Sequence, residues 1–137
     1  EVAPRLTFVI VPPMRSLEPY RQKIDALQER CPVRAALDVI RGRWKPSILF
    51  EIHSGPKRFS DLQSALPGIT PQALSLQLRQ LEADGVVARA VFAEEAPVRV
   101  VYSLTQDGQA LSGVMDQLEQ WGAAYLARRP RRKPRAA

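Results

Sequence analysis

The sequence predicts a mainly helical α+β fold in which a single small β-hairpin is set among helices. In several segments apolar residues recur at helical spacing, and glycine or proline separates one segment from the next. Residues 60–84 fit a helix, a tight turn and a second helix. Two valine-rich runs, 86–93 and 99–104, then flank a polar connection, which is the pattern of a hairpin. A hairpin that directly follows such a helix pair predicts a winged helix-turn-helix.

Length and composition indicate one packed domain. A chain of 137 residues leaves little room for a second core, and 45% hydrophobic with 25% charged residues is ordinary for a globular protein. The single cysteine, Cys31, allows no disulfide within the chain, so we expect a reducing cytoplasm. The apolar run 6–11 is too short for a signal-peptide core or a membrane span.

The net charge of +6 comes from the C-terminus. Six basic residues lie in an Arg/Pro-rich tail, 128–137, while residues 1–127 carry fourteen basic and fourteen acidic side chains. The tail supplies only non-specific attraction to a polyanion. A nucleic-acid partner therefore has to be inferred from where single charges fall in the fold.

The domain is expected to span residues 18–127. Ahead of it, segment 1–17 contains Pro12-Pro13 and then Met14, which could be the natural start, so we expect this segment to be disordered or foreign to the protein. We leave it out of the fold. Helices are predicted over 18–30, where Tyr20, Ile24 and Leu27 recur at helical spacing, over 33–41, where Leu37, Val39 and Ile40 are buried, and over 44–53.

The helix-turn-helix has strong local signals. Ser60 precedes a short apolar run that ends at the turn dipeptide Pro67-Gly68. Thr70 is a good N-cap and Pro71 is tolerated at the first helical position, so a second helix begins there. Gly85 ends that helix after residue 84.

One face of this second helix is apolar, and the other could read DNA. At about 100° per residue, Leu74, Leu78 and Leu81 form one buried stripe. The opposite side presents Gln72, Ala73, Ser75, Leu76 and Arg79. In a major groove glutamine pairs with adenine, arginine pairs with guanine, and an apolar side chain meets the thymine methyl. Each residue alone is more often plain solvated surface, but the ordered combination of turn, cap, stripe and hairpin favours DNA binding.

Basic residues around this helix are expected to position the protein on the phosphates. Lys57 and Arg58 lie where the chain enters the first helix of the motif, and Ser60 offers a hydroxyl there. Arg99 could reach the DNA backbone from the hairpin. Two glutamates at the hairpin tip, residues 94–95, would repel phosphate, so we expect the tip to point away from the DNA.

Thr105 is expected to cap a long C-terminal helix, and the apolar surface of the two end helices exceeds what one small domain covers. The predicted dimer interface consists of Tyr20, Ile24, Leu27, Leu111, Met115, Leu118, Trp121 and Tyr125. A symmetric homodimer would set two reading helices about one duplex turn apart, on an inverted repeat. The alternative, that these helices pack only on their own core, stays open.

Four strings of the sequence carry a resemblance to a known family: CPVRAALDVIRGRWKPSILFEI, GPKRFSDLQSALPGITPQALSLQLRQLEADGVVAR, APVRVVYSLTQDGQAL and LEQW. With these strings, the chain from about Arg30 to Trp121 closely resembles the HxlR-type winged helix-turn-helix regulators of the MarR-like group. The resemblance implies a cytoplasmic homodimer that binds a palindromic operator in double-stranded DNA, and we expect a repressor. The positions that match DNA-facing residues of the family are Lys57, Arg58, Ser60, Thr70, Gln72 and Ser75. Leu76 stands where a polar residue is more usual, and the basic tail lies outside the family pattern.

Cys31 matches a cysteine that senses electrophiles, quinones or disulfide stress in several members similar to this chain. The resemblance therefore makes Cys31 a candidate redox sensor, and an electrophile or another small molecule a candidate effector. A helix N-terminus with Arg30 and Arg34 nearby favours the thiolate. The alternative is a small buried hydrophobe.

The two alternative functions are an enzyme and a module that binds protein or RNA. An enzyme is disfavoured because the sole histidine, His53, has no catalytic partners in the sequence, and no metal-ligand spacing, phosphate loop or cofactor motif is present. Trp44 and Phe59 are expected to pack in the core rather than stack on a ligand. A winged helix that binds protein or RNA without operator specificity stays open, because the fold does not fix the function.

Overall fold

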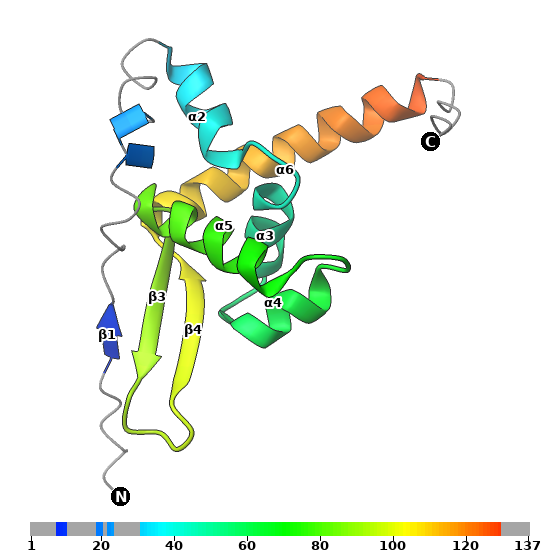
Figure 1. The fold of residues 1–137 in the computed structure, drawn as a ribbon. Helices are drawn as coiled ribbons and strands as arrows, with labels where there is room; N and C mark the ends of the chain where they lie inside the picture. The colour runs from blue at the N-terminus through cyan, green and yellow to red at the C-terminus, as the bar shows by residue number, and fades with distance from the viewer. Residues whose placement is uncertain (1–7, 11–18, 21, 24–30, 130–137) are drawn as a thin grey trace, which may run out of the picture.

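The computed structural model describes residues 8–10, 19–20, 22–23 and 31–129, and it confirms the predicted fold class (Figure 1). The elements follow the order β1 (Phe8–Ile10), α2 (Pro32–Ile40), α3 (Lys45–His53), β2 (Lys57–Arg58), α4 (Phe59–Ala65), α5 (Pro71–Ala83), β3 (Val87–Phe92), β4 (Arg99–Leu104) and α6 (Gln106–Ala127). The helix-turn-helix is α4 and α5, and the wing is the β3–β4 hairpin. No helix in these described ranges is long and apolar enough to cross a membrane.

The sheet is antiparallel, with the strand order β1-β3-β4-β2. In the wing, Val87 pairs with Leu104 and Phe92 with Arg99. The strand β1, which the sequence analysis left outside the fold, pairs along β3 with Phe8 opposite Phe92. Residues 8–10 of the apolar run thus form an edge strand of the sheet, beside β3.

The core lies between the helix-turn-helix and the sheet. Leu62 from α4 and the α5 stripe Leu74, Leu78 and Leu81 are at most 1% exposed, as is Ile48 from α3. Trp44 and Phe59 pack against this cluster, as predicted. The apolar periodicity of α4 and α5 therefore fixes which side of each helix faces inward.

The turn between α4 and α5 and both ends of α5 follow the local signals. Gly68 has φ of 90°, a backbone conformation that disfavours a side chain. The Thr70 Oγ1 accepts a hydrogen bond from the N–H of Ala73 at 3.1 Å, and Pro71 occupies the first turn. The helix ends at Ala83, and Gly85 follows with φ of 78°. These features set the start, length and direction of α5.

The predicted burial of Leu37 is wrong, since half of this residue is exposed. Val33 on the same side of α2 is also exposed, whereas Ile40 is buried. Figure 1 shows the reason: α2 meets the body of the molecule only with its C-terminal end. The apolar stripe of α2 is therefore real, but only its last turn reaches the core.

The first half of α6 packs on the domain and the second half projects from it (Figure 1). At Gly108 an added Cβ would collide with the backbone carbonyl of Val86, so this glycine permits close approach to the start of β3. Leu111 and Met115 pack against the core of their own subunit. Both residues are only partly buried, so their place in a dimer interface stays a prediction.

Candidate DNA interface

The outer face of α5 is built by the burial of its inner face. Gln72 is exposed, and Leu76 keeps 44% of its surface accessible, on the side opposite the leucine stripe. Thr70 lies exposed at the start of the helix. Ser75 is half-buried on the flank, and Ala73 packs against the core rather than outward. The part of α5 that is free to enter a groove is therefore narrower than the sequence suggested and centres on Gln72 and Leu76.

Arg79 lies on the flank of α5 that faces the wing. It is half-buried, and Glu82 on the next turn lies near both Arg79 and Arg89 of β3. Burial raises the pKa of the Glu82 carboxyl, while Arg89 and Arg79 act in the opposite direction. The charge of Arg79 is thus partly balanced by Glu82 within the protein.

The entry to α4 carries the predicted phosphate contacts. Lys57 and Arg58 form the short strand β2, paired with Tyr102 and Val101 of β4, and Arg58 remains exposed. The backbone N–H of Arg58 donates to Oδ2 of Asp61 at 3.1 Å. Ser60 is exposed in the first turn. Strand pairing therefore holds these residues at the base of the wing, beside the start of α4.

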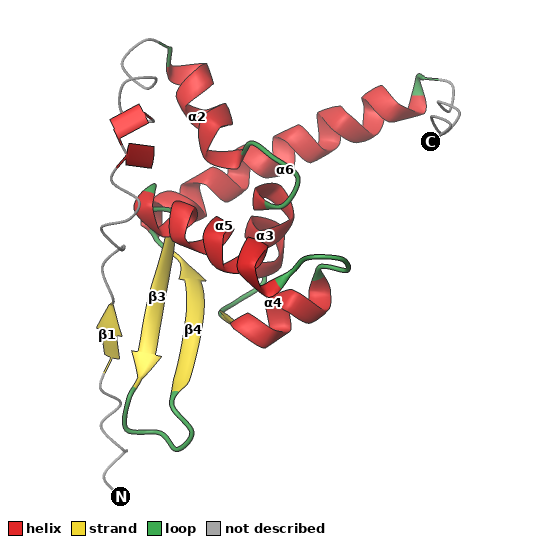
Figure 2. Cartoon of the chain, viewed as in Figure 1, coloured by secondary structure: helices red, strands yellow, loops and turns green. Residues whose placement is uncertain are grey.

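The wing extends beyond the helices (Figure 2). Near its tip, Arg99 Nε lies 3.0 Å from Oε2 of Glu95, and the Arg99 guanidinium stacks over the ring of Phe92 at 4.2 Å. The Nε–H of Arg99 makes no hydrogen bond to an acceptor among the described residues, so its contact with Glu95 is an ion pair only. Arg99 is thereby held against the wing, and Glu95 has a cationic partner.

A partly buried polar chain links three segments of the protein at the end of α5. Lys45, which is 2% exposed at the start of α3, donates from Nζ to the hydroxyl of Tyr20 at 2.9 Å. The Tyr20 hydroxyl in turn donates to Oδ2 of Asp84, the C-cap of α5, at 3.0 Å. Burial lowers the pKa of Lys45 and raises that of Tyr20. We call these three residues the Tyr20–Lys45–Asp84 chain.

Sequence reasoning missed this chain and placed Tyr20 in the dimer interface, which stays a prediction. The Tyr20 hydroxyl is bonded within its own subunit. A lysine inside an otherwise apolar α3 was the available signal, because a buried lysine needs a polar partner. Which distant residue supplies that partner could not be read from local spacing.

The predicted interface residues of α6 fall into two groups. Leu118 and Trp121 are exposed, and Trp121 stacks on Tyr125 with the ring centroids 5.0 Å apart. Val114 and Leu126, which the prediction omitted, are exposed as well. Ile24 and Leu27 lie outside the described residues. The second half of α6 thus carries apolar surface that its own domain leaves uncovered.

Cys31 is exposed, at the N-cap position of α2. It is therefore not the buried hydrophobe that was the alternative. His53 is exposed at the end of α3. Over the residues described, no group of three or more His, Cys, Asp or Glu is placed to hold a metal ion.

The chain was compared with known proteins. The model of a family described as HxlR-like helix-turn-helix matches residues 39–130. YdeP of Bacillus subtilis, an uncharacterized HTH-type transcriptional regulator, is 43% identical over 100 residues, which are 73% of this chain and 77% of YdeP. The solved structure of the redox regulator HypR in its reduced form has a TM-score of 0.65 at 42% identity, covering 69% of this chain and 92% of HypR.

Diamide-treated YodB from B. subtilis has a TM-score of 0.61 at 33% identity, covering 69% of this chain and 94% of YodB. The family match includes the whole helix-turn-helix, the wing and α6. This chain therefore belongs to the HxlR-like helix-turn-helix family, whose members are DNA-binding transcriptional regulators and not enzymes.

Proposed function

We propose that the chain is a sequence-specific repressor that acts as a homodimer on an inverted-repeat operator. The main support for this proposal is the contrast between the two sides of α5. The leucine stripe is fully buried, and Gln72 and Leu76 are exposed on the opposite side. An amide and an apolar side chain can pair with adenine and with the thymine methyl in a major groove. Exposed Arg58 and Ser60 beside the start of α4 would hold the phosphates.

The homodimer is supported by the apolar surface of the two projecting helices. Val33 and Leu37 on α2 and Leu118, Trp121 and Leu126 on α6 are 43–72% exposed. A symmetric partner would cover such surface from water, which favours association. Dimerisation would also place two copies of α5 on one side of the duplex, as an inverted repeat requires.

Redox control through Cys31 is the finer part of the proposal. The thiol is exposed at a helix start, and one similar structure is that of a redox regulator, HypR. Two Cys31 thiols of a dimer would lose two electrons and two protons to an oxidant such as diamide, and an S–S bond would form. A small thiol could replace the second Cys31. If Cys31→Ser leaves DNA release by diamide unchanged, the control lies elsewhere.

The test of the function is selection of bound sequences from random DNA duplexes, followed by footprinting of the selected site. We expect an inverted repeat with half-site centres about one helical turn apart and strong weakening of binding by salt. Equal affinity for unrelated duplexes, or preferential binding of single-stranded RNA, would instead support the module without operator specificity.

A further inference from the structure

A groove of about 660 Å³ runs over the surface of α3, between α6 and the turn that joins α4 to α5. Its walls include Leu49, Phe50 and Trp44 from the α3 region and Met115 from α6. Phe50 is 59% exposed, which is unusual for a phenylalanine on a helix of a small domain. The volume lies within the range of sites for small organic molecules.

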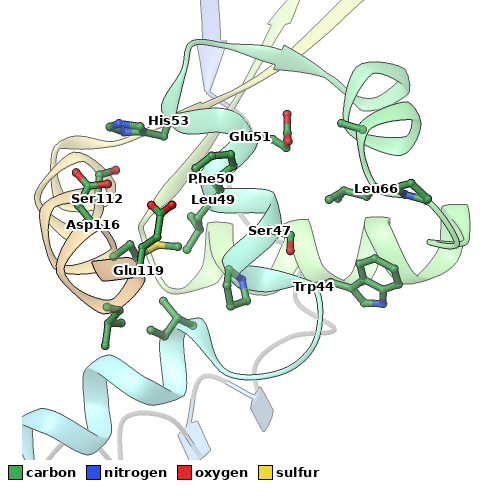
Figure 3. A pocket seen from close by; sticks show the side chains of 16 residues that line it. Trp44, Ser47, Leu49, Phe50, Glu51, His53, Leu66, Ser112, Asp116 and Glu119 are labelled. Carbon is green, nitrogen blue, oxygen red and sulfur yellow. The ribbon is translucent and has the colours of Figure 1, made fainter. Parts of the chain in front are cut away.

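The charged residues that line the groove are all acidic apart from His53. Asp116 and Glu119 come from α6 and Glu51 from α3, and neither lysine nor arginine is among the lining residues. Figure 3 shows His53 pointing from the end of α3 toward α6, where Asp116 and Glu119 lie. An apolar wall with an acidic edge complements a molecule that has an apolar body and a positive charge.

We propose that this groove binds a small amphiphilic organic cation, such as an aromatic amine or a quaternary ammonium ion. The apolar body would lie against Leu49, Phe50 and Met115, and the cationic head would lie beside Asp116 and Glu119. An aromatic face within reach of the cation adds attraction, which Phe50 can supply. This proposal concerns ligand binding and does not depend on the operator.

The acidic side of the groove and most of the apolar surface assigned to the dimer lie on different sides of α6, and Leu118 lies at the border because it belongs to both. At 100° per residue, Ser112, Asp116 and Glu119 fall within an arc of about 60°. Val114, Trp121 and Tyr125 fall roughly opposite that arc. A second copy that packs on Trp121 therefore leaves the acidic side of α6 open to solvent, and a small ligand fits the groove better than the partner's α6 does.

Fluorescence anisotropy of the full chain with two dyes tests this site. Rhodamine 6G is a cationic aromatic dye, and fluorescein is an anionic dye with a similar ring system. We expect rhodamine 6G to bind at least about tenfold more tightly than fluorescein, because Asp116 and Glu119 would attract the cation and repel the anion. The double variant Asp116→Asn/Glu119→Gln should lose that preference.

Glu94→Gln/Asp107→Asn is the matched control, because it removes two carboxylates outside the groove and should keep the preference. Phe50→Ala is a second variant at an exposed position, and it should weaken rhodamine binding with an unchanged Tm. Equal binding of both dyes, or full rhodamine affinity in Asp116→Asn/Glu119→Gln, would overturn the proposal. The proposal would also be overturned if the parent chain bound no dye and Asp116→Asn/Glu119→Gln lost the dimer in sedimentation. The groove would then be an interface between copies of the chain.

Discussion

Gln72 and Leu76 share the outer face of α5 but offer different chemistry to a groove. Gln72 presents a donor and an acceptor that can pair with an adenine edge, whereas Leu76 presents only apolar surface. Removing water from an exposed leucine lowers the free energy of the system, so contact with a thymine methyl would stabilise the complex. We therefore expect these two residues to specify different bases in the half-site.

Leu76→Gln should change the base preference and keep the fold. The substitution replaces methyl contact with amide hydrogen bonding at an exposed site, so we expect one or two half-site positions to shift, with discrimination of about 1–3 kcal/mol per pair. Selection from random duplexes would show this shift. An unchanged selected sequence would mean that Leu76 does not contact bases.

Glu82 allows a pH prediction. Its pKa in the folded chain is raised above the ordinary 4.5, so the folded state holds more protons than the unfolded state as the pH rises from 4.5 through the folded pKa. Stability is therefore lost across that window, and the ionised carboxylate is unfavourable at pH 7. Glu82→Gln should raise the free energy of unfolding at pH 7, and the difference should vanish near pH 4.

Urea denaturation of both proteins at pH 7 and pH 4 measures this difference. The same substitution removes a negative charge beside Arg79 and Arg89. We therefore also expect tighter binding to duplex DNA and a steeper salt dependence. A variant less stable than the parent at pH 7 would show that the two arginines outweigh the burial of Glu82.

At the scale of elements, α5 is anchored at both ends. The Thr70 side chain caps its start, and the Tyr20–Lys45–Asp84 chain holds its end against α3 and the N-terminal helical segment. Lys45 is 2% exposed, so its ammonium group depends on partners inside the protein. The position of α5 is therefore coupled to residues far from it in sequence.

Tyr20→Phe should destabilise the protein by about 1–3 kcal/mol, because Lys45 loses a buried acceptor and Asp84 loses a donor. Tyr125→Phe is the matched control on α6, because Tyr125 is not part of the Tyr20–Lys45–Asp84 chain. It should change stability by less than about 0.5 kcal/mol. Thermal and urea unfolding measure both. Equal effects of the two substitutions on stability would show that Tyr20 does not anchor α5.

Elements with local signals were predictable from the sequence, and those that depend on distant contacts were not. Thr70-Pro71, Gly85 and the leucine stripe specify α5 within fifteen residues, so its bounds and its buried face were predicted correctly. The partner of Lys45 and the exposure of Leu37 depend on how helices meet in space. Likewise, the pairing of Arg99 with Glu95 needed the geometry of the wing.

At the scale of the whole molecule, the compact helix-turn-helix contrasts with the projecting ends of α2 and α6 (Figure 1). The core covers the leucines of α4 and α5, while Trp121 on α6 remains 63% exposed. Exposed aromatic surface on a projecting helix is characteristic of an association surface. The two functions proposed for the chain, dimer formation and DNA contact, thus lie on separate parts of the fold.

Trp121→Glu should convert the dimer to a monomer, because a charge would replace a large apolar side chain at the centre of the exposed stripe. Sedimentation velocity at micromolar concentration checks this result. Gln120→Glu adds the same charge on another side of α6, outside the stripe, and should leave the dimer intact. A parent chain that sediments as a monomer would contradict the homodimer.

The central claim is that the outer side of α5 reads duplex DNA, and the double variant Gln72→Ala/Arg79→Ala tests it most directly. Affinity for the selected operator should be measured by fluorescence anisotropy, with circular dichroism to verify the fold. The account predicts a loss of at least about 2 kcal/mol, roughly thirtyfold, and a smaller loss for unrelated duplexes, which lose only the charge of Arg79. Full operator affinity in the folded variant would contradict the claim.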